Sequence, residues 1–264
     1  MAMTKRKGKE QHRAEGQEFT SLLDPLDKLD NLHTIFVRQP CRAREVLIEM
    51  LCPGMVSNKF DVGYSDSPNP SKPNFIPLFY FEEESDCLAR FCCKSARPLT
   101  FKALREKGND SSLLFTIDRP FRMGVCCLDP RRGCLGMGYL RVLTAEGALM
   151  GDILLIRDSC ASCSLGYAFS VCDARGAEIC KLERRNCCVF SCCGKDVAFA
   201  ITINDVDTGK VVAKTWSGVL KELFTDYDNF RVEVPNQFQH SRYKKLLLVA
   251  TSMLLDLKFF EKDG

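Results

Sequence analysis

The 264-residue sequence has little histidine and almost no net charge, and each shortage argues against a class of function. Its formal net charge is +3, from 37 basic and 34 acidic residues, which is too balanced for a protein whose main partner is a nucleic-acid backbone. The three histidines, His12, His33 and His240, form no constellation with glutamate, and no glycine-rich phosphate loop or Ser/His/Asp signature is present. We therefore expect neither a nucleic-acid partner nor a zinc-dependent enzyme.

The sequence also lacks an apolar run of the roughly 20 residues that a bilayer-spanning helix needs. The nearest approach is residues 246–255, which follow Lys244 and Lys245 and precede Asp256 and Lys258. This length favours a helix buried in a protein core, because a helix that is apolar on all sides needs apolar surroundings. A single membrane span remains the alternative, since lysine can snorkel and the basic N-terminal flank suits an anchor.

The start of the chain carries no apolar run behind its basic residues, so it does not read as a secretory signal peptide. We predict that residues 1–21 form a disordered basic tail and that residues 22–264 form one domain. Against this background, 16 cysteines are far more than an ordinary chain of this length contains. In a reducing cytosol they would serve as metal ligands, acylation sites or small hydrophobic core residues.

Short apolar segments separated by turn residues dominate the chain up to Trp216, which predicts an antiparallel sheet or barrel. Residues 59–64 and 78–81 are expected as strands, residues 65–77 as a loop insertion, and part of residues 22–55 as an amphipathic helix. Two hairpins are expected further on. One lies at residues 167–183 around a turn ending in Gly176, and the other joins residues 197–203 to 210–216 through a polar turn at 204–209.

A set of motifs occurs in the same order as in the phospholipid scramblases, and the chain resembles that family from about Asp24 to Glu261. The motifs are Ser57-Asn58-Lys59-Phe60, Phe79-Tyr80-Phe81, Cys92-Cys93 with Arg97-Pro98, Arg119-Pro120-Phe121-Arg122, Cys192-Cys193-Gly194, Trp216-Ser217-Gly218, Phe224-Thr225-Asp226-Tyr227, and Leu255-Asp256-Leu257-Lys258-Phe259-Phe260. The resemblance implies a mainly β, tubby-like fold, a single closed antiparallel β-barrel around a hydrophobic C-terminal α-helix.

The same resemblance implies ATP-independent, calcium-promoted, bidirectional movement of phospholipids between leaflets, without covalent chemistry. It places the protein at a phospholipid membrane, on the cytoplasmic face of the plasma membrane, as a lipid-anchored or single-pass protein that could have protein partners. The alternative is a membrane-associated interaction module that binds lipid, acts in signalling or gene regulation, and does not scramble.

Residues 226–237 resemble the calcium-binding loop described for the scramblases. By that resemblance the ligands would be Asp226, Asp228, Phe230, Val232 and Val234. The twelfth position is Gln237, where an EF-hand supplies a bidentate acid, and Arg231 places a cation beside the ion. We therefore expect Ca²⁺ to bind with low affinity. The alternative is a turn in which the two aspartates accept backbone hydrogen bonds before a strand at residues 230–234.

Cys126, Cys127 and Cys134 align with the cysteine-rich stretch that carries palmitate in the family. Neighbouring arginines would lower the pKa of exposed thiols and attract anionic headgroups, although these cysteines could equally be buried. Cys160 and Cys163 have a spacing that suits zinc, but adjacent pairs such as Cys187-Cys188 point to opposite faces of a strand. Packing is therefore favoured for the remaining cysteines, with a cysteine-only zinc site as the alternative.

Overall fold

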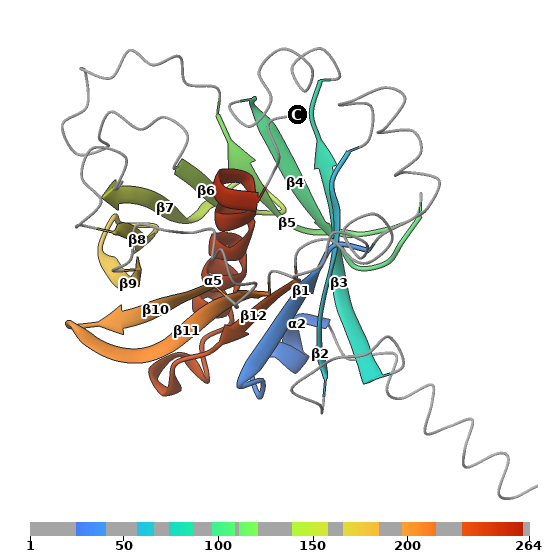
Figure 1. Ribbon diagram of the computed structural model, residues 1–264. Helices are drawn as coiled ribbons and strands as arrows, with labels where there is room; N and C mark the ends of the chain where they lie inside the picture. Colours follow the sequence, from blue (N-terminus) through green and yellow to red (C-terminus); the bar gives the residue numbers. More distant parts are fainter. Residues whose placement is uncertain are drawn as a thin grey trace, which may run out of the picture.

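The structure is a computed structural model that describes residues 25–40, 57–65, 74–86, 97–108, 111–120, 139–157, 166–184, 197–214 and 229–260. Within these ranges the chain is mainly β (Figure 1). The strands are β1 (Thr34–Arg38), β2 (Lys59–Ser65), β3 (Phe75–Glu84), β4 (Leu99–Leu104), β5 (Leu113–Arg119), β6 (Tyr139–Thr144), β7 (Leu149–Arg157), β8 (Tyr167–Asp173), β9 (Glu178–Arg184), β10 (Val197–Ile203), β11 (Val206–Lys214) and β12 (Asn229–Glu233).

These strands follow one another as an antiparallel meander that closes into a barrel, because β1 pairs with both β2 and β12. Alternation along each strand decides which side chains face the interior. In β4, for example, Leu99, Phe101 and Ala103 are buried while the residues between them are partly exposed. Closure leaves no unpaired edge strand among the described residues. The predicted mainly β, closed-barrel fold is confirmed.

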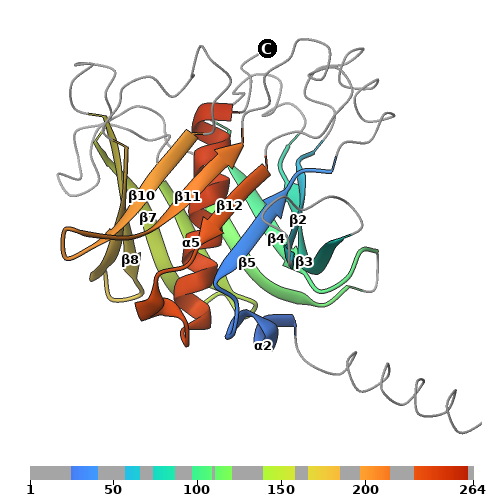
Figure 2. The same ribbon diagram turned by 60° about the horizontal axis from the view of Figure 1, so that its bottom comes forward.

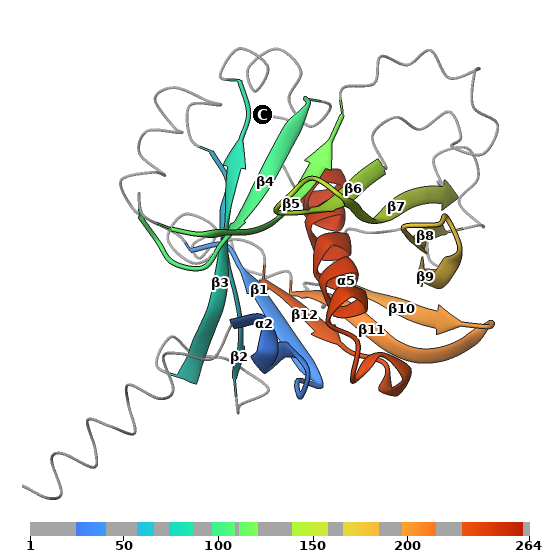
Figure 3. The same cartoon turned by 180° about the vertical axis from the view of Figure 1, so that it is seen from behind.

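The helix α5 (Arg242–Leu255) runs through the middle of this barrel, with strands on every side (Figures 1 and 3). Every residue from Lys245 to Leu255 is buried, as the all-round apolar sequence predicts. The chain then continues as the π-helix η5 (Asp256–Phe260), in which the Phe259 ring stacks on Phe199 with centroids 5.7 Å apart. The prediction of a buried core helix is confirmed.

The hairpin between β8 and β9 follows from local turn chemistry. Gly176 adopts φ +80°, and the Asp173 carboxylate accepts hydrogen bonds from the backbone N–H of Arg175 and Ala177, each at 2.9 Å. The hairpin between β10 and β11 is tighter than the predicted turn at 204–209. Asn204 and Asp205 both take positive φ, as a two-residue hairpin turn requires, so β11 already begins at Val206.

One prediction in the first part of the chain needs correction, and another is confirmed in part. Residues 65–77 were expected as a loop, but β3 already starts at Phe75, and its early residues pair with the end of β2. The predicted helix in part of residues 22–55 corresponds to the five-residue helix α2 (Pro25–Leu29), which is followed by β1. Ile35 and Phe36 lie in β1, where pairing with β12 holds them as a strand, and residues 41–56 lie outside the described residues.

α2 is attached to the start of α5 by two basic side chains. The buried ammonium of Lys245 donates to the carbonyl oxygens of Leu29 at 2.5 Å and Asp30 at 3.0 Å, and burial lowers its pKa. Arg242 pairs with Asp27 and Asp30 at 2.6 and 2.9 Å. The last carbonyls of a short helix are thereby satisfied, and α2 packs beside the N-terminal end of α5.

Candidate functional site

The two ends of the barrel differ in the segments that join the strands. At the upper end, defined here as the end where β1, β3, β5, β7, β9 and β11 finish, α5 also terminates (Figure 2). At the lower end the even-numbered strands finish, α5 begins and α2 lies. Because the strands alternate in direction, every odd-to-even connection starts and finishes at the upper end.

The cysteines are unevenly distributed between the connections at the two ends of the barrel. Of the 16 cysteines, two, Cys172 and Cys180, lie in strands, and the other 14 belong to connections that join strands at the upper end. Connections at the lower end contain none. Cys126, Cys127 and Cys134, predicted for acylation, fall between β5 and β6 and lie outside the described residues. The CxxC pair and the adjacent cysteine pairs also lie outside them.

The two cysteines in strands are buried, and each belongs to the β8–β9 hairpin. Burial raises the pKa of both thiols, and that of Cys180 rises from its ordinary value of 9.0 to about 12. At neutral pH both side chains are therefore protonated thiols; Cys180 packs in the core as a small hydrophobic group, whereas Cys172 lies within 3.4 Å of the Ser170 hydroxyl.

Cys180 is expected to resist alkylation by iodoacetamide at pH 8 in the folded protein, because a pKa of about 12 leaves roughly one thiol in ten thousand ionised. Its stabilising effect should be complete below pH 9.0 and be lost as the pH rises toward about 12, since the unfolded thiol ionises first. Peptide mapping by mass spectrometry and melting of Cys180→Ala against pH measure both effects. Equal labelling of folded and guanidinium-unfolded protein would contradict the assignment.

The predicted calcium segment is largely a strand. Phe230 and Val232 lie in β12 with fully buried side chains, and β12 pairs with β1 on one side and β11 on the other. The carbonyl groups of a strand paired on both sides are used in the ladder. The Val234 carbonyl accepts a hydrogen bond from Gln239 Nε2 at 3.4 Å.

β12 also separates the two ends of that segment. Its first residue, Asn229, lies at the upper end, whereas the exposed Gln237 follows β12 at the lower end. Five residues of strand cover about 17 Å, while an EF-hand brings its first and twelfth residues to one ion. The calcium prediction stays untested. Its two remaining candidate ligands, Asp226 and Asp228, lie outside the described residues. Within the described ranges, no three His, Cys, Asp or Glu side chains gather as a metal site.

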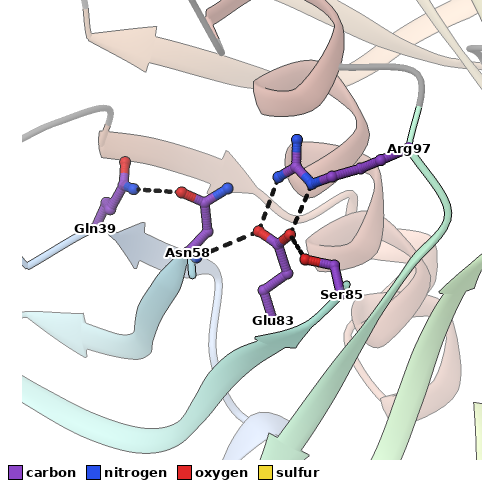
Figure 4. A network of polar contacts seen from close by, with 5 residues as sticks. All are labelled: Gln39, Asn58, Glu83, Ser85 and Arg97. Carbon is purple, nitrogen blue, oxygen red and sulfur yellow. Dashed lines mark hydrogen bonds and ion pairs between the residues drawn. The ribbon is translucent and has the colours of Figure 1, made fainter. Parts of the chain in front are cut away.

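A buried ion pair lies at the upper end, where β3 finishes and β2 and β4 begin (Figure 4). Arg97 donates to both carboxylate oxygens of Glu83, at 2.8 and 2.9 Å, and both side chains are almost fully buried. Ser85 and the Asn58 backbone N–H donate to the same carboxylate, and Gln39 donates to the Asn58 side chain. Burial raises the pKa of Glu83, but the hydrogen bonds and charge of Arg97 and the other donors outweigh it, so the net pKa is lowered.

Sequence reasoning missed this pair, although one signal was available. Phe79, Phe81 and Glu83 share the inward face of β3, and a carboxylate on that face requires a buried partner. The network ties the start of β2, the end of β3 and the start of β4 together. It holds the upper rim in place and supplies no reactive group.

A pocket of about 430 Å³ lies beside β2 and β3, and its charged side chains are paired with each other. Lys107 contacts Asp61 at 2.8 Å and lies over the Tyr80 ring at 4.4 Å, while Lys59 contacts Glu82 at 3.3 Å. This pairing leaves no excess charge to attract a headgroup. Among the described residues, the barrel interior is filled by α5 and apolar side chains.

None of the helices in the described part of the chain combines the length and the apolar character that a membrane crossing requires.

Comparison with known proteins gives a consistent result. The profile of the Scramblase family matches residues 24–262. Phospholipid scramblase 1 of Homo sapiens is 28% identical over 242 residues, covering 90% of this chain and 66% of that protein, and its Rattus norvegicus counterpart is 27% identical, covering 90% and 63%. Phospholipid scramblase family member 5 of Homo sapiens is 26% identical, covering 91% and 79%. The chain thus spans a little under two thirds of the first two relatives. No solved structure matches it significantly.

Proposed function

We propose that this chain, which belongs to the Scramblase family, promotes the ATP-independent, bidirectional movement of phospholipids between bilayer leaflets. The match over residues 24–262 carries the proposal, because it spans the complete barrel and its central helix. The relatives are phospholipid scramblases by name. No covalent step is involved, so the proposal assigns no catalytic residue.

The filled barrel limits how such movement takes place. α5 and the aromatic side chains of β3, β4 and β5 occupy the interior, and the buried hydroxyls of Thr251 and Ser252 already donate to carbonyls of their own helix. A hydrated headgroup would therefore be poorly compensated there. Lipids would therefore cross along the outside of the barrel, through a bilayer that the bound protein disturbs. Acylation at Cys126, Cys127 and Cys134 would hold the protein on the cytoplasmic face of the plasma membrane, and Ca²⁺ at Asp226 and Asp228 would promote the movement.

The second candidate is a lipid-binding interaction module without scrambling activity, which acts in signalling or gene regulation through protein partners. The filled interior favours it, because a docking domain needs no path for lipid through its barrel. The two candidates differ in one measurable property. Both bind lipid, but only the first equalises the lipids of the two leaflets.

Proteoliposomes that contain the full chain and a fluorescent phospholipid are expected to lose inner-leaflet fluorescence to dithionite when Ca²⁺ is added. The calcium response should need about 0.1–1 mM Ca²⁺, because two carboxylates without a terminal acid make a weak site. Asp226→Ala combined with Asp228→Ala should remove the response. A submicromolar response would contradict the weak site, and absent flip with intact vesicle binding would favour the interaction module.

A further inference from the structure

The pocket beside β2 and β3 lies on the outside of the barrel and is built from two rows of side chains. Lys59 is opposite Glu82 in one row, and Asp61 is opposite Tyr80 in the other. These residues alternate with core residues such as Phe60, so their side chains point away from the barrel interior. Two strand residues separate the rows, a distance of about 7 Å. The pocket volume of about 430 Å³ is within the usual range for small-molecule sites.

An ammonium group already occupies the row of Asp61 and Tyr80. Lys107 reaches it from the connection between β4 and β5, with Nζ 2.8 Å from the Asp61 carboxylate and 4.4 Å from the centre of the Tyr80 ring. The Asp61 side chain is only 11% exposed, whereas that of Lys107 is 45% exposed. A carboxylate beside an aromatic face is the kind of surrounding that recognises an organic ammonium ion. Lys107 therefore takes the place that the ammonium of a ligand fits.

The electrostatics of the pocket suit a ligand that carries both signs of charge. Burial raises the pKa of Tyr80, and the charges of Asp61 and Glu106 raise it further, so the ring is neutral and lies in a negative potential. The other row holds a cation and an anion, since Lys59 contacts Glu82 at 3.3 Å. Both of these side chains are more than one third exposed, so their pair opens at little cost in free energy.

We propose that this pocket binds a zwitterion in which an ammonium is joined to a phosphodiester, the headgroup chemistry of phosphatidylcholine. The ligand ammonium replaces Lys107 against Asp61 and the Tyr80 ring, and the phosphate lies toward Lys59 with the released Lys107 as a second donor. This inference rests on the proposed membrane function and names a headgroup class for it. The two lysines and two carboxylates of the pocket cancel in charge, so recognition depends on short-range contacts and not on attraction at a distance.

Other ligand classes fit these side chains less well. A simple anion would meet Asp61 and Glu82 beside the two lysines, and a headgroup with an added carboxylate would bring a negative charge that no excess cation balances. A divalent metal ion would find two carboxylates and two repelling ammonium groups. The pocket also faces the outside of the barrel, where lipids cross in the proposed function because the described interior is filled.

The first experiment titrates the full chain with glycerophosphocholine, a soluble net-neutral phosphodiester, and follows binding by calorimetry or ligand-observed NMR. A Kd of about 1–10 mM is expected, because a headgroup alone offers few contacts. Asp61→Asn should bind at least about tenfold more weakly and Tyr80→Leu about fivefold more weakly. The matched control is Asp118→Asn, which removes a carboxylate paired with Arg141 on the outer face of β5 and should leave binding unchanged.

The second experiment uses choline alone and tests the place that Lys107 takes. Lys107→Met should bind choline at least about threefold more tightly, because the internal ammonium no longer competes for the site. Lys102→Met, which removes the exposed partner of Glu84, should not change choline binding. No binding of glycerophosphocholine at about 50 mM, an equal loss in Asp118→Asn, or weaker choline binding by Lys107→Met overturns the proposal.

Two further ligands identify the source of the zwitterion. Sedimented phosphatidylcholine vesicles should bind wild-type protein more strongly than Asp61→Asn, as a lipid headgroup in the pocket requires. Binding of glycerophosphocholine without any such difference on vesicles would assign the pocket to a soluble phosphodiester and overturn the lipid. Glycerophosphoserine should bind at least about threefold more weakly than glycerophosphocholine, and equal binding would contradict a preference for net-neutral headgroups.

The dithionite assay on the same proteins separates this inference from the proposed function. Loss of glycerophosphocholine binding in Asp61→Asn, combined with no flip by wild-type protein, would overturn scrambling and leave the pocket standing. Flip by wild-type protein that does not bind glycerophosphocholine would leave scrambling standing and overturn the pocket.

Discussion

Replacing Arg97 with methionine is expected to lower the free energy of unfolding by about 3–5 kcal/mol, a large part of the stability of a single domain. The substitution leaves the Glu83 carboxylate buried without its cation, while Ser85 and Asn58 supply only two neutral donors. Desolvation would then raise the pKa of Glu83, so the variant would take up a proton on folding. Chemical denaturation of wild type and variant at pH 7 measures the difference.

A neighbouring pair on the same strands supplies the control for that experiment. Lys102 contacts Glu84 at 2.7 Å, but both side chains are exposed, so Lys102→Met should cost about 0–1 kcal/mol. Equal losses of unfolding free energy for Arg97→Met and Lys102→Met would show that burial of the Arg97–Glu83 pair adds nothing to stability. Replacing Glu83 and Arg97 together by methionine should recover most of the loss, because neither charge is then left unpaired.

The pH dependence of the wild-type protein has a definite sign at this site. The folded protein holds the pKa of Glu83 below its ordinary value of 4.5. Stability from this carboxylate is therefore complete above pH 4.5 and is lost as the pH falls through the lower folded value. In Arg97→Met the folded pKa of Glu83 lies above 4.5, so this carboxyl group should stabilise the variant progressively as the pH falls from neutral to 4.5.

Features that depend on a few neighbouring residues could be predicted from the sequence. The β8–β9 hairpin is specified by Asp173 and Gly176, which lie three residues apart and satisfy their own turn. The burial of α5 was also predictable, since residues 246–255 leave no polar face for solvent. Both patterns are complete within one short stretch of chain.

Features that join distant residues could not be predicted in the same way. Arg97 and Glu83 meet only because β3 and β4 pair, and Gln39 reaches the network from the end of β1. The conformation of residues 229–233 was decided by β1 and β11, which hold them as a strand.

Single aspartate substitutions at four consecutive positions of α5 are each expected to prevent folding at room temperature. Leu247, Leu248, Val249 and Ala250 are all completely buried. Successive helical residues are about 100° apart, so these four positions sample the whole circumference of α5. An unpaired carboxylate buried in an apolar core lowers the free energy of unfolding by several kcal/mol. The packing contacts of the replaced side chain are lost as well. Soluble yield and the melting temperature in detergent-free buffer measure the outcome.

Tyr243 lies in the first turn of the same helix and is 39% exposed, so Tyr243→Asp is the matched control. It should melt like wild type or slightly higher, because a negative charge near a helix N-terminus is favourable. A helix lying on a surface would tolerate aspartate at one of the four positions, since one side would face water. Normal melting of any of the four variants would therefore contradict a helix enclosed by the barrel, whereas failure of all four with an intact control is the result that enclosure requires.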